Sequence, residues 1–564
     1  MVHVFVKRFN RKLQAFMNSC IGTFIVFFIL LLVTLYLECD RIDKARVIHE
    51  QYLDYCKMHA TCGQEHDLMM PTAEKPTSFM SFVVWLFRLE NTDVSRGRPT
   101  MWWSIFPLTS ALQLETVYAF HQSAVKRLEY VRIDADYDNG YAGRILPPAR
   151  PLKCCKNDES LPQLKTLYND IFKRKPGQFV PDRKNRNLLF NAFYQYFVLQ
   201  FFDVNSNLTV TASQLYGSDA VSERSMRSLS GGKLKTLEFN SDLYAPNQVF
   251  ELRSSVFSKA WKKSISNDGS WLSRTIARIF KRADMLSASP MLFVMSTIWV
   301  REHNRVCDEL SQKSPAWTDE ELYTTARNIV TGQMMTIMMN EILNVKLRPE
   351  VYHHRMESIR GLGTPIELYL TMAVSSLPEN LIYNSTSLMH FSNTRQVLEG
   401  GLQNAMEFMV NSKMGGVTAH NDGAPTESMT KALITLSREH CLQGFNSYRR
   451  RLGLKAYKSI VEMTRNSDTA IPLLELYQTV EKVEFLTGML AEGTSSQVLS
   501  TAEVLTNSYI INAILTNNLT SLDSWVPYTF GGEDCFKLVK TANLKSLVCR
   551  NMECDGLDIQ LYAK

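Results

Sequence analysis

The fold of this chain is decided by residues Leu292 to Leu343, which read LFVMSTIWVREHNRVCDELSQKSPAWTDEELYTTARNIVTGQMMTIMMNEIL. Apolar residues recur here at the spacing of one helix face, which predicts a helix that packs against a core. The positions that carry this pattern are Leu292, Met295, Trp299, Val306 and Leu310. Pro315 is expected to end this first helix, because proline cannot continue a helical hydrogen-bond ladder.

A second helix is expected to start at Thr318. Glu321 follows three residues later, which is a capping box: each side chain satisfies a backbone N–H left unpaired at the start of a helix. Its apolar face continues through Leu322, Ala326, Ile329 and Val330. The stretch therefore predicts a pair of buried helices joined by a short proline turn.

The identities of the residues are more specific than their spacing. Trp299 to Asp308 (WVREHNRVCD), followed by Leu322-Tyr323 and by Ala326 to Val330 (ARNIV), resembles the animal haem peroxidase superfamily, and within it the cyclooxygenases, or prostaglandin endoperoxide synthases. Further blocks carry the same resemblance: Ala135-Asp136-Tyr137, Arg144 to Pro148, Asn187 to Phe202, Leu215-Tyr216-Gly217, Gly232 to Lys235, Leu442 to Tyr457 and Trp525 to Cys549. The resemblance implies a mainly α-helical, haem-peroxidase-like domain over residues 131–564.

Composition and charge do not point to a nucleic-acid partner. Charged residues make up 21% and apolar residues 45% of the chain, as in ordinary folded proteins. The formal charge of +6 is small for 564 residues, and basic residues form only local clusters such as Arg449-Arg450-Arg451.

The N-terminal region predicts a membrane attachment. Residues 15–37 are uncharged and almost wholly apolar, long enough to cross a hydrocarbon core of about 30 Å. The basic tail over residues 1–14, with Lys7, Arg8, Arg11 and Lys12, is expected to stay in the cytosol. We interpret this segment as an uncleaved transmembrane signal anchor; the alternative is a cleaved signal peptide, although no small-residue cleavage site follows.

Two segments separate this anchor from the catalytic-type domain. Residues 38–75 contain three cysteines, Cys39, Cys56 and Cys62, and are interpreted as a stalk or as a remnant of the epidermal-growth-factor-like module of cyclooxygenases. Residues 76–130 contain the aromatic runs Phe79 to Leu89 and Trp102 to Leu112. The family resemblance implies membrane-associating helices there, and packing on the globular domain is the alternative.

Cysteines and glycosylation sequons agree with a lumenal or extracellular domain. The chain has 11 cysteines, which suits an oxidising compartment, and Cys549 and Cys554 are close enough to pair across a tight loop. Sequons start at Asn207, Asn384 and Asn518. We therefore expect a single-pass glycoprotein of the endoplasmic reticulum or cell surface, with its C-terminal domain on the lumenal or outer side.

The haem chemistry of the family needs histidines that this sequence lacks. A haem peroxidase uses one histidine as iron ligand and a second, distal histidine to move a proton, usually beside a glutamine. The resemblance places Gln195 at the glutamine position, Leu199 at the distal histidine and Tyr196 at an adjacent family histidine. No histidine lies between residues 122 and 302, so a shift of the alignment does not restore one.

The remaining family positions are also substituted. Val374 matches the proximal ligand, and no histidine occurs from 355 to 389. Thr371 matches the tyrosine that carries the oxygenase radical, with Tyr369 two residues away. The arginine that holds the fatty-acid carboxylate and the serine that lines the channel match Leu112 and Ile510.

These substitutions predict a pseudoenzyme without haem that acts by binding a partner or an apolar ligand. The aliphatic replacements suit a filled pocket, and a pocket that holds a lipid fits them too. Cyclooxygenases are homodimers, so the resemblance also implies a homodimer or a heterodimer with an active relative. The alternative function is a haem-dependent peroxidase or prostaglandin-synthase-type oxidoreductase with unusual ligands. No metal site is predicted; His353-His354 and His390 are interpreted as surface residues, and His303 as a buried, hydrogen-bonded one.

Overall fold

The computed structural model describes residues 145–149, 161–175, 177–202, 209–217, 219–246, 290–347, 349, 365–375, 382–383, 386–387, 395–423, 426–493 and 499–562. Several predictions fall outside the described residues: the basic tail 1–14, the anchor 15–37, the regions 38–75 and 76–130, Leu112, Asn207 and Asn384.

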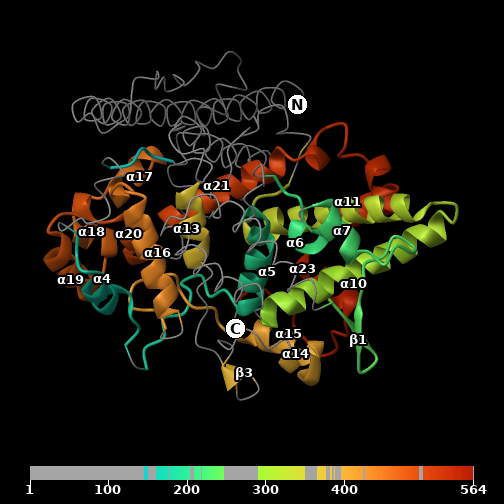
Figure 1. Ribbon diagram of the computed structural model, residues 1–564, viewed down its shortest axis with the longest axis horizontal. Helices are drawn as coiled ribbons and strands as arrows, with labels where there is room; N and C mark the ends of the chain where they lie inside the picture. Colours follow the sequence, from blue (N-terminus) through green and yellow to red (C-terminus); the bar gives the residue numbers. More distant parts are fainter. Residues whose placement is uncertain are drawn as a thin grey trace, which may run out of the picture. The chain divides into compact units, whose positions relative to one another are not determined.

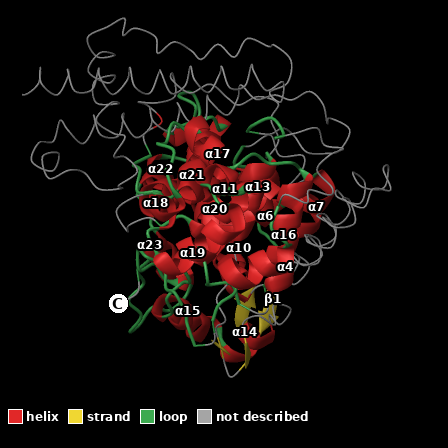
Figure 2. Ribbon diagram, turned by 90° about the vertical axis from the view of Figure 1, so that its left-hand side faces the viewer, coloured by secondary structure: helices red, strands yellow, loops and turns green. Residues whose placement is uncertain are grey.

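The described part of the chain is mainly helical, as the sequence predicted (Figures 1 and 2). Its α-helices are α4 (Leu164–Leu167), α5 (Leu188–Val198), α6 (Ser213–Tyr216), α7 (Ala220–Met226), α10 (Pro290–Lys313), α11 (Asp319–Ile337), α13 (Ile366–Ser375), α14 (Arg395–Gly400), α15 (Leu402–Asn411), α16 (Glu427–Glu439), α17 (Phe445–Arg451), α18 (Ile460–Thr464), α19 (Ser467–Tyr477), α20 (Phe485–Ala491), α21 (Thr501–Leu515), α22 (Glu533–Lys540) and α23 (Leu544–Asn551).

Shorter elements connect or extend these helices. The 3₁₀ and π turns are η4 (Tyr168–Phe172), η5 (Leu199–Phe202), η6 (Met338–Ile342), η8 (Val480–Lys482), η9 (Asn518–Thr520) and η10 (Pro527–Phe530). Strands β1 (Leu237–Phe239) and β2 (Asp242–Tyr244) pair antiparallel, with Glu238 opposite Leu243. Strands β3 (Ile382–Tyr383) and β4 (Thr386–Ser387) form a second, smaller antiparallel hairpin.

The predicted pair of long helices is α10 and α11, which pack against each other (Figure 1). Every residue of both predicted apolar stripes is buried. Pro315 lies in the connection, and the Thr318–Glu321 capping box is present at the start of α11. The capping box and the proline turn are local features, which is why the sequence located them to the residue.

The second helix differs from a simple amphipathic helix in its last turns. From Ile329 to Met339 it is buried on all sides, and it changes to the π turn η6 at Met338. The cause is packing from more than one direction, because α11 contacts α10, α22 and η10. Gly332 makes the approach of α22 close, since a Cβ atom there would lie 2.8 Å from Cγ1 of Val539.

Around this pair, α5 and α23 pack on α10, and α15 packs on both α5 and α10. A second group of helices surrounds α13, which contacts α16, α20 and α21. Helix α17 packs closely on α20, because a Cβ atom at Gly488 would meet the Phe445 side chain at 2.1 Å. These two groups contain the positions that the family resemblance assigned to haem chemistry.

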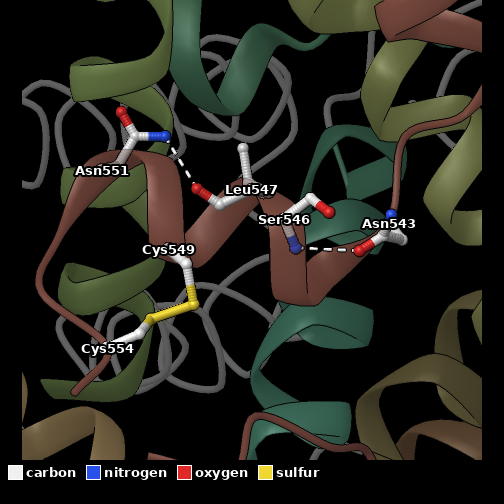
Figure 3. Close-up of a disulfide and its surroundings, with 6 residues drawn as sticks. All are labelled: Asn543, Ser546, Leu547, Cys549, Asn551 and Cys554. Atoms are coloured by element: carbon white, nitrogen blue, oxygen red, sulfur yellow. Dashed lines mark hydrogen bonds between the residues drawn. A yellow bond between two sulfur atoms is a disulfide. The ribbon is translucent and has the colours of Figure 1, made fainter.

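A disulfide joins Cys549 in the last turn of α23 to Cys554 beyond its end, as predicted (Figure 3). Asn543 caps the start of the same helix by accepting a hydrogen bond from the Ser546 N–H. Cys441 is also disulfide-bonded, whereas Cys307 and Cys535 are free and buried. Among the helices within the described ranges, none is long and apolar enough to span a membrane.

Candidate functional site

The resemblance assigns the distal side of the family's haem site to residues that the structure places in α5 and the 3₁₀ turn η5. Asn187 starts α5 by accepting a hydrogen bond from the Phe190 N–H at 3.1 Å. Its side-chain amide also donates to the carbonyls of Val410 and Gln560, which fixes this end of the helix. Gln195 is buried, and Leu199 is half-buried at the first position of η5.

The polar side chain next to Leu199 holds the backbone in place. Gln200 is buried and donates to the Phe197 carbonyl at 2.8 Å. Its side-chain oxygen accepts hydrogen bonds from the Thr211 and Ala212 N–H groups at 2.9 and 3.0 Å. The sequence analysis did not predict a role for Gln200, although this residue directly follows Leu199. Its role depends on residues eleven and twelve positions away that pattern reasoning does not pair.

The proximal side corresponds to α13. Val374 lies in the last turn of this helix, and Thr371 is buried one turn earlier. The Thr371 hydroxyl donates to the Glu367 carbonyl at 2.7 Å, so it is bonded within its own helix. The Glu367 side chain is buried as well and accepts a hydrogen bond from the Tyr448 hydroxyl at 3.1 Å. This buried carboxylate was missed because its partner comes from α17, 81 residues later.

The channel position described by the structure is also filled by an aliphatic side chain. Ile510 is fully buried in α21, a helix that packs on α13. Thr371 and Ile510 therefore belong to neighbouring helices. Tyr369, on α13, is also buried.

His303 lies in the stretch Trp299 to Asp308 of α10, which carries the family resemblance and is called the signature below. Its side chain is buried, and both ring nitrogens are within hydrogen-bond distance of a partner. The Tyr216 hydroxyl lies 3.0 Å from its Nδ1, and its Nε2 lies 2.9 Å from the Gly232 carbonyl. Since a carbonyl only accepts, Nε2 carries the proton and Nδ1 accepts from the hydroxyl. Burial lowers the pKa of His303 to about 4, so the ring is neutral at pH 7.

Two guanidinium groups strengthen this preference for a neutral ring. Tyr216 and Tyr323 make edge contacts with His303, and with each other. Arg227 lies over the Tyr323 ring at 3.9 Å and Arg327 over the Tyr216 ring at 5.1 Å. After burial, these cations also lower the pKa of His303, because they disfavour a second positive charge.

The preceding residue, Glu302, has a fully buried carboxylate. Its two oxygens accept hydrogen bonds from Arg305 at 2.9 and 3.1 Å, from Gln333 of α11 at 3.0 Å, and from Arg550 and Asn551 of α23 at 3.2 and 2.8 Å. Burial raises the pKa of Glu302, but hydrogen bonds and charge from Arg305 and Arg550 outweigh it and lower the pKa overall. The carboxylate therefore connects α10, α11 and α23.

The other signature residues also bind the scaffold. Arg301 donates to the carbonyls of Leu243 and Asn551 at 2.6 and 2.9 Å. Asn304 exchanges two hydrogen bonds with the backbone of Leu234 at 2.8 and 3.0 Å. The signature thus fixes the hairpin, the preceding loop and α23 on one side of α10.

The residues that the resemblance assigns to the family's histidine positions do not fit haem. Leu199 and Val374 are aliphatic, so neither can ligate iron or carry a proton. His303 has no free ring nitrogen, and His440 and His420 lie at the end of α16 and in the loop before it. Within the part of the chain that the structure describes, no group of three or more histidine, cysteine, aspartate or glutamate side chains is arranged to hold a metal ion.

The class of protein follows from the fold and from comparison with known families. The family model for animal haem peroxidases matches residues 203–376 and 374–553, and the chain belongs to this family. The two matched segments overlap at residues 374–376, which include Val374, the residue that the resemblance assigns to the proximal ligand position.

Within the family, the chain is similar to prostaglandin G/H synthases. It is 27% identical over 449 residues to the Bos taurus prostaglandin G/H synthase 2, with 73% of this chain and 71% of that protein covered. It is 28% identical over 452 residues to the Mus musculus prostaglandin G/H synthase 1, with 75% and 73% covered. A crystal structure of the Oryza sativa fatty acid alpha-dioxygenase with palmitic acid has the same fold, with a TM-score of 0.57, 14% identity, and coverage of 86% of this chain and 96% of that one.

We expect Glu302→Gln to destabilise the domain by about 3 kcal/mol or more, because it leaves buried donors facing a neutral amide. Urea unfolding at pH 7 measures the change. The lowered pKa of Glu302 means that its contribution is present above the ordinary pKa of a glutamate and is lost as pH falls below it. The difference between wild type and variant should therefore shrink toward pH 3.

Glu309→Gln is the matched control for this change. Glu309 lies two turns later on α10, is partly exposed, and pairs with Arg305 and Lys313. Removing it should alter the free energy of unfolding by less than about 1 kcal/mol. Equal effects of the two substitutions would contradict a special role for the buried carboxylate.

We expect acidification from pH 7 to pH 5 to weaken the domain through His303. The unfolded histidine binds a proton near its ordinary pKa of 6.5, whereas the folded one binds it only near 4. The unfolded state therefore holds more protons in this range, and stability falls as pH falls. His303→Gln, which can keep both hydrogen bonds, should reduce this pH dependence in urea unfolding. An unchanged pH dependence in the variant would show that His303 is already charged in the folded domain.

Proposed function

We propose that this chain is a pseudoenzyme of the animal haem peroxidase family, which keeps the fold without holding haem in the family's way. The observation that carries the proposal is the loss of imidazole from both faces of the site. The resemblance assigns Leu199, which lies in η5, to the distal position and Val374, which lies in α13, to the proximal position. No histidine lies between 122 and 302 or between 355 and 389 to replace them.

The surrounding contacts support loss of the chemistry with retention of the scaffold. Gln200 follows Leu199, and Thr371 lies one turn before Val374. The side chains of Gln200 and Thr371 form hydrogen bonds with backbone groups. Glu302 and His303 of the signature helix are satisfied by other helices and loops. These hydrogen bonds join parts of the protein to one another, so they can stabilise the fold whether or not iron is bound.

Binding is the function that we infer for the retained fold. Thr371 and Ile510 are buried on the packed helices α13 and α21, in surroundings that suit an apolar ligand or a filled interior. The partner that we propose is a second copy of the chain or an active relative, because its prostaglandin G/H synthase relatives resemble it over most of their length. Light scattering of the purified chain tests self-association.

We also propose that residues 15–37 anchor the chain in a membrane with the helical domain on the lumenal or extracellular side. The basic flank of the apolar segment supports this orientation. The exposed side chain of Asn518 and the disulfide between Cys549 and Cys554 suit such a compartment.

Haem titration tests the pseudoenzyme proposal. We expect the full-length chain in detergent to show no Soret band of ligated haem and no peroxidase turnover, because no imidazole is available at either face. Visible spectra during hemin addition provide the measurement. The Mus musculus prostaglandin G/H synthase 1, carried through the same steps, is the positive control. A Soret band with turnover would establish the alternative, a haem oxidoreductase with unusual ligands.

Glycosylation and extraction test the proposed topology. We expect the chain made with microsomes to resist carbonate extraction and to shift in mobility after glycosidase treatment. Asn518→Gln should remove one glycan, because its side chain is exposed and its sequon ends at Thr520. Asn517 is the preceding residue and does not begin a sequon, so Asn517→Gln should leave the glycan count unchanged. An unglycosylated, carbonate-extractable chain would contradict both the anchor and its orientation.

A further inference from the structure

A cluster of basic side chains lies on the turn that leads into α5. Arg183, Lys184 and Arg186 all reach the carboxylate of Glu503, in the first turn of α21. The N–O distances are 2.6, 3.0 and 3.4 Å. The partners are more than 300 residues apart in the sequence, so only the folded domain assembles this cluster.

The turn that carries the basic residues is held in place by Asp182. This buried carboxylate accepts hydrogen bonds from the backbone N–H groups of Lys184 and Arg186 at 2.9 and 3.3 Å. It also binds the Arg186 guanidinium through two hydrogen bonds, at 2.9 and 2.5 Å. Arg186 further lies over the Phe190 ring at 4.8 Å. The positions of the basic groups are therefore fixed before any ligand arrives.

The cluster has more positive than negative charge. Asp182 neutralises Arg186, while the single carboxylate of Glu503 is shared between Arg183 and Lys184. Burial raises the pKa of Glu503, but the three neighbouring cations lower it well below its usual range, so Glu503 stays ionised at neutral pH. Three cations and two carboxylates leave a net charge of +1 beside the start of α21. The partial positive charge of the helix N-terminus adds to it.

Hydrogen-bond donors in the cluster also exceed its acceptors. The Nε of Arg183 is buried and has no acceptor among the described residues. The Lys184 ammonium has three N–H groups, and the acceptor that the described residues give it is Oε1 of Glu503. Burial lowers the pKa of Lys184, which shows that its charge is partly removed from water. Yet the Arg183 and Lys184 side chains remain 26% and 24% exposed, so a small ligand can reach them.

We propose that Arg183 and Lys184 form a binding site for an oxyanion, either a carboxylate or a phosphate group. Guanidinium and ammonium groups bind such oxygens through short, charge-assisted hydrogen bonds. An added oxyanion would accept from the Lys184 ammonium, which has N–H groups beyond the one bonded to Glu503, and its negative charge would balance the excess positive charge of Arg183 and Lys184.

Calorimetry with inorganic phosphate tests the site in the full-length chain, in detergent and at constant ionic strength. We expect saturable binding by the wild type. Arg183→Gln and Lys184→Gln should each weaken it by about tenfold or more, because each removes a charge-assisted donor. Lys233→Gln is the matched control, since Lys233 is a partly exposed lysine paired with Asp308 at 2.6 Å elsewhere in the domain. Absence of binding, or equal loss in the Lys233 variant, would overturn the proposal.

A second variant should act in the opposite direction. Glu503→Gln removes the internal carboxylate that competes with the ligand, while glutamine still completes the capping box with Ser500. We expect this variant to bind phosphate more tightly than the wild type by about tenfold. If the cluster were only a structural ion pair, the same substitution would lower the melting temperature without improving phosphate binding, and that result would overturn the proposal.

A lipid probe separates the two sources of the oxyanion. Phosphatidic acid, dispersed in the same detergent, presents a phosphate monoester on a lipid, and phosphatidylcholine serves as its control. Binding of phosphatidic acid that depends on Arg183 and Lys184 and exceeds phosphate binding supports a lipid head group. Similar binding of both supports a free anion. Phosphatidic acid binding that survives both substitutions would overturn the site.

Discussion

The buried carboxylate of Glu302 is the interaction on which the rest of this domain depends. An ionised group without water is costly, so every lone pair must find a donor. Those donors come from Arg305 on the same helix, from Gln333 on α11 and from Arg550 and Asn551 on α23. The requirement therefore fixes where these helices lie along one another, and the disulfide at Cys549 closes the loop behind the last two donors.

This network gives the residues Trp299 to Asp308 a structural role that does not depend on haem. Arg301, Glu302, His303 and Asn304 each contact a different part of the structure, and none of them needs iron to be satisfied. These contacts do not involve Leu199 or Val374, the residues that the resemblance assigns to the histidine positions, because those two residues belong to other elements, η5 and α13. Polar groups of this signature helix therefore stabilise the family's fold through contacts within the protein itself.

The sequence predicted local features well. Helices α10 and α11, their buried stripes, the Thr318 capping box and the short-range disulfide all depend on residues close in the chain. The sequence did not find the roles of Gln200 or Glu367, because their partners lie far along the chain or on other helices. Nor did periodicity indicate that α11 is buried on all sides in its last turns.

By itself, the sequence determined the class of fold and the two long stretches without histidine, residues 122–302 and 355–389, since these follow from residue identity and spacing. Only the tertiary structure decided that His303 is neutral, that Glu302 joins three helices, and that Glu503 meets a basic turn more than 300 residues away. The physical reason is that protonation and charge pairing depend on burial and on neighbours in space. A linear pattern contains neither.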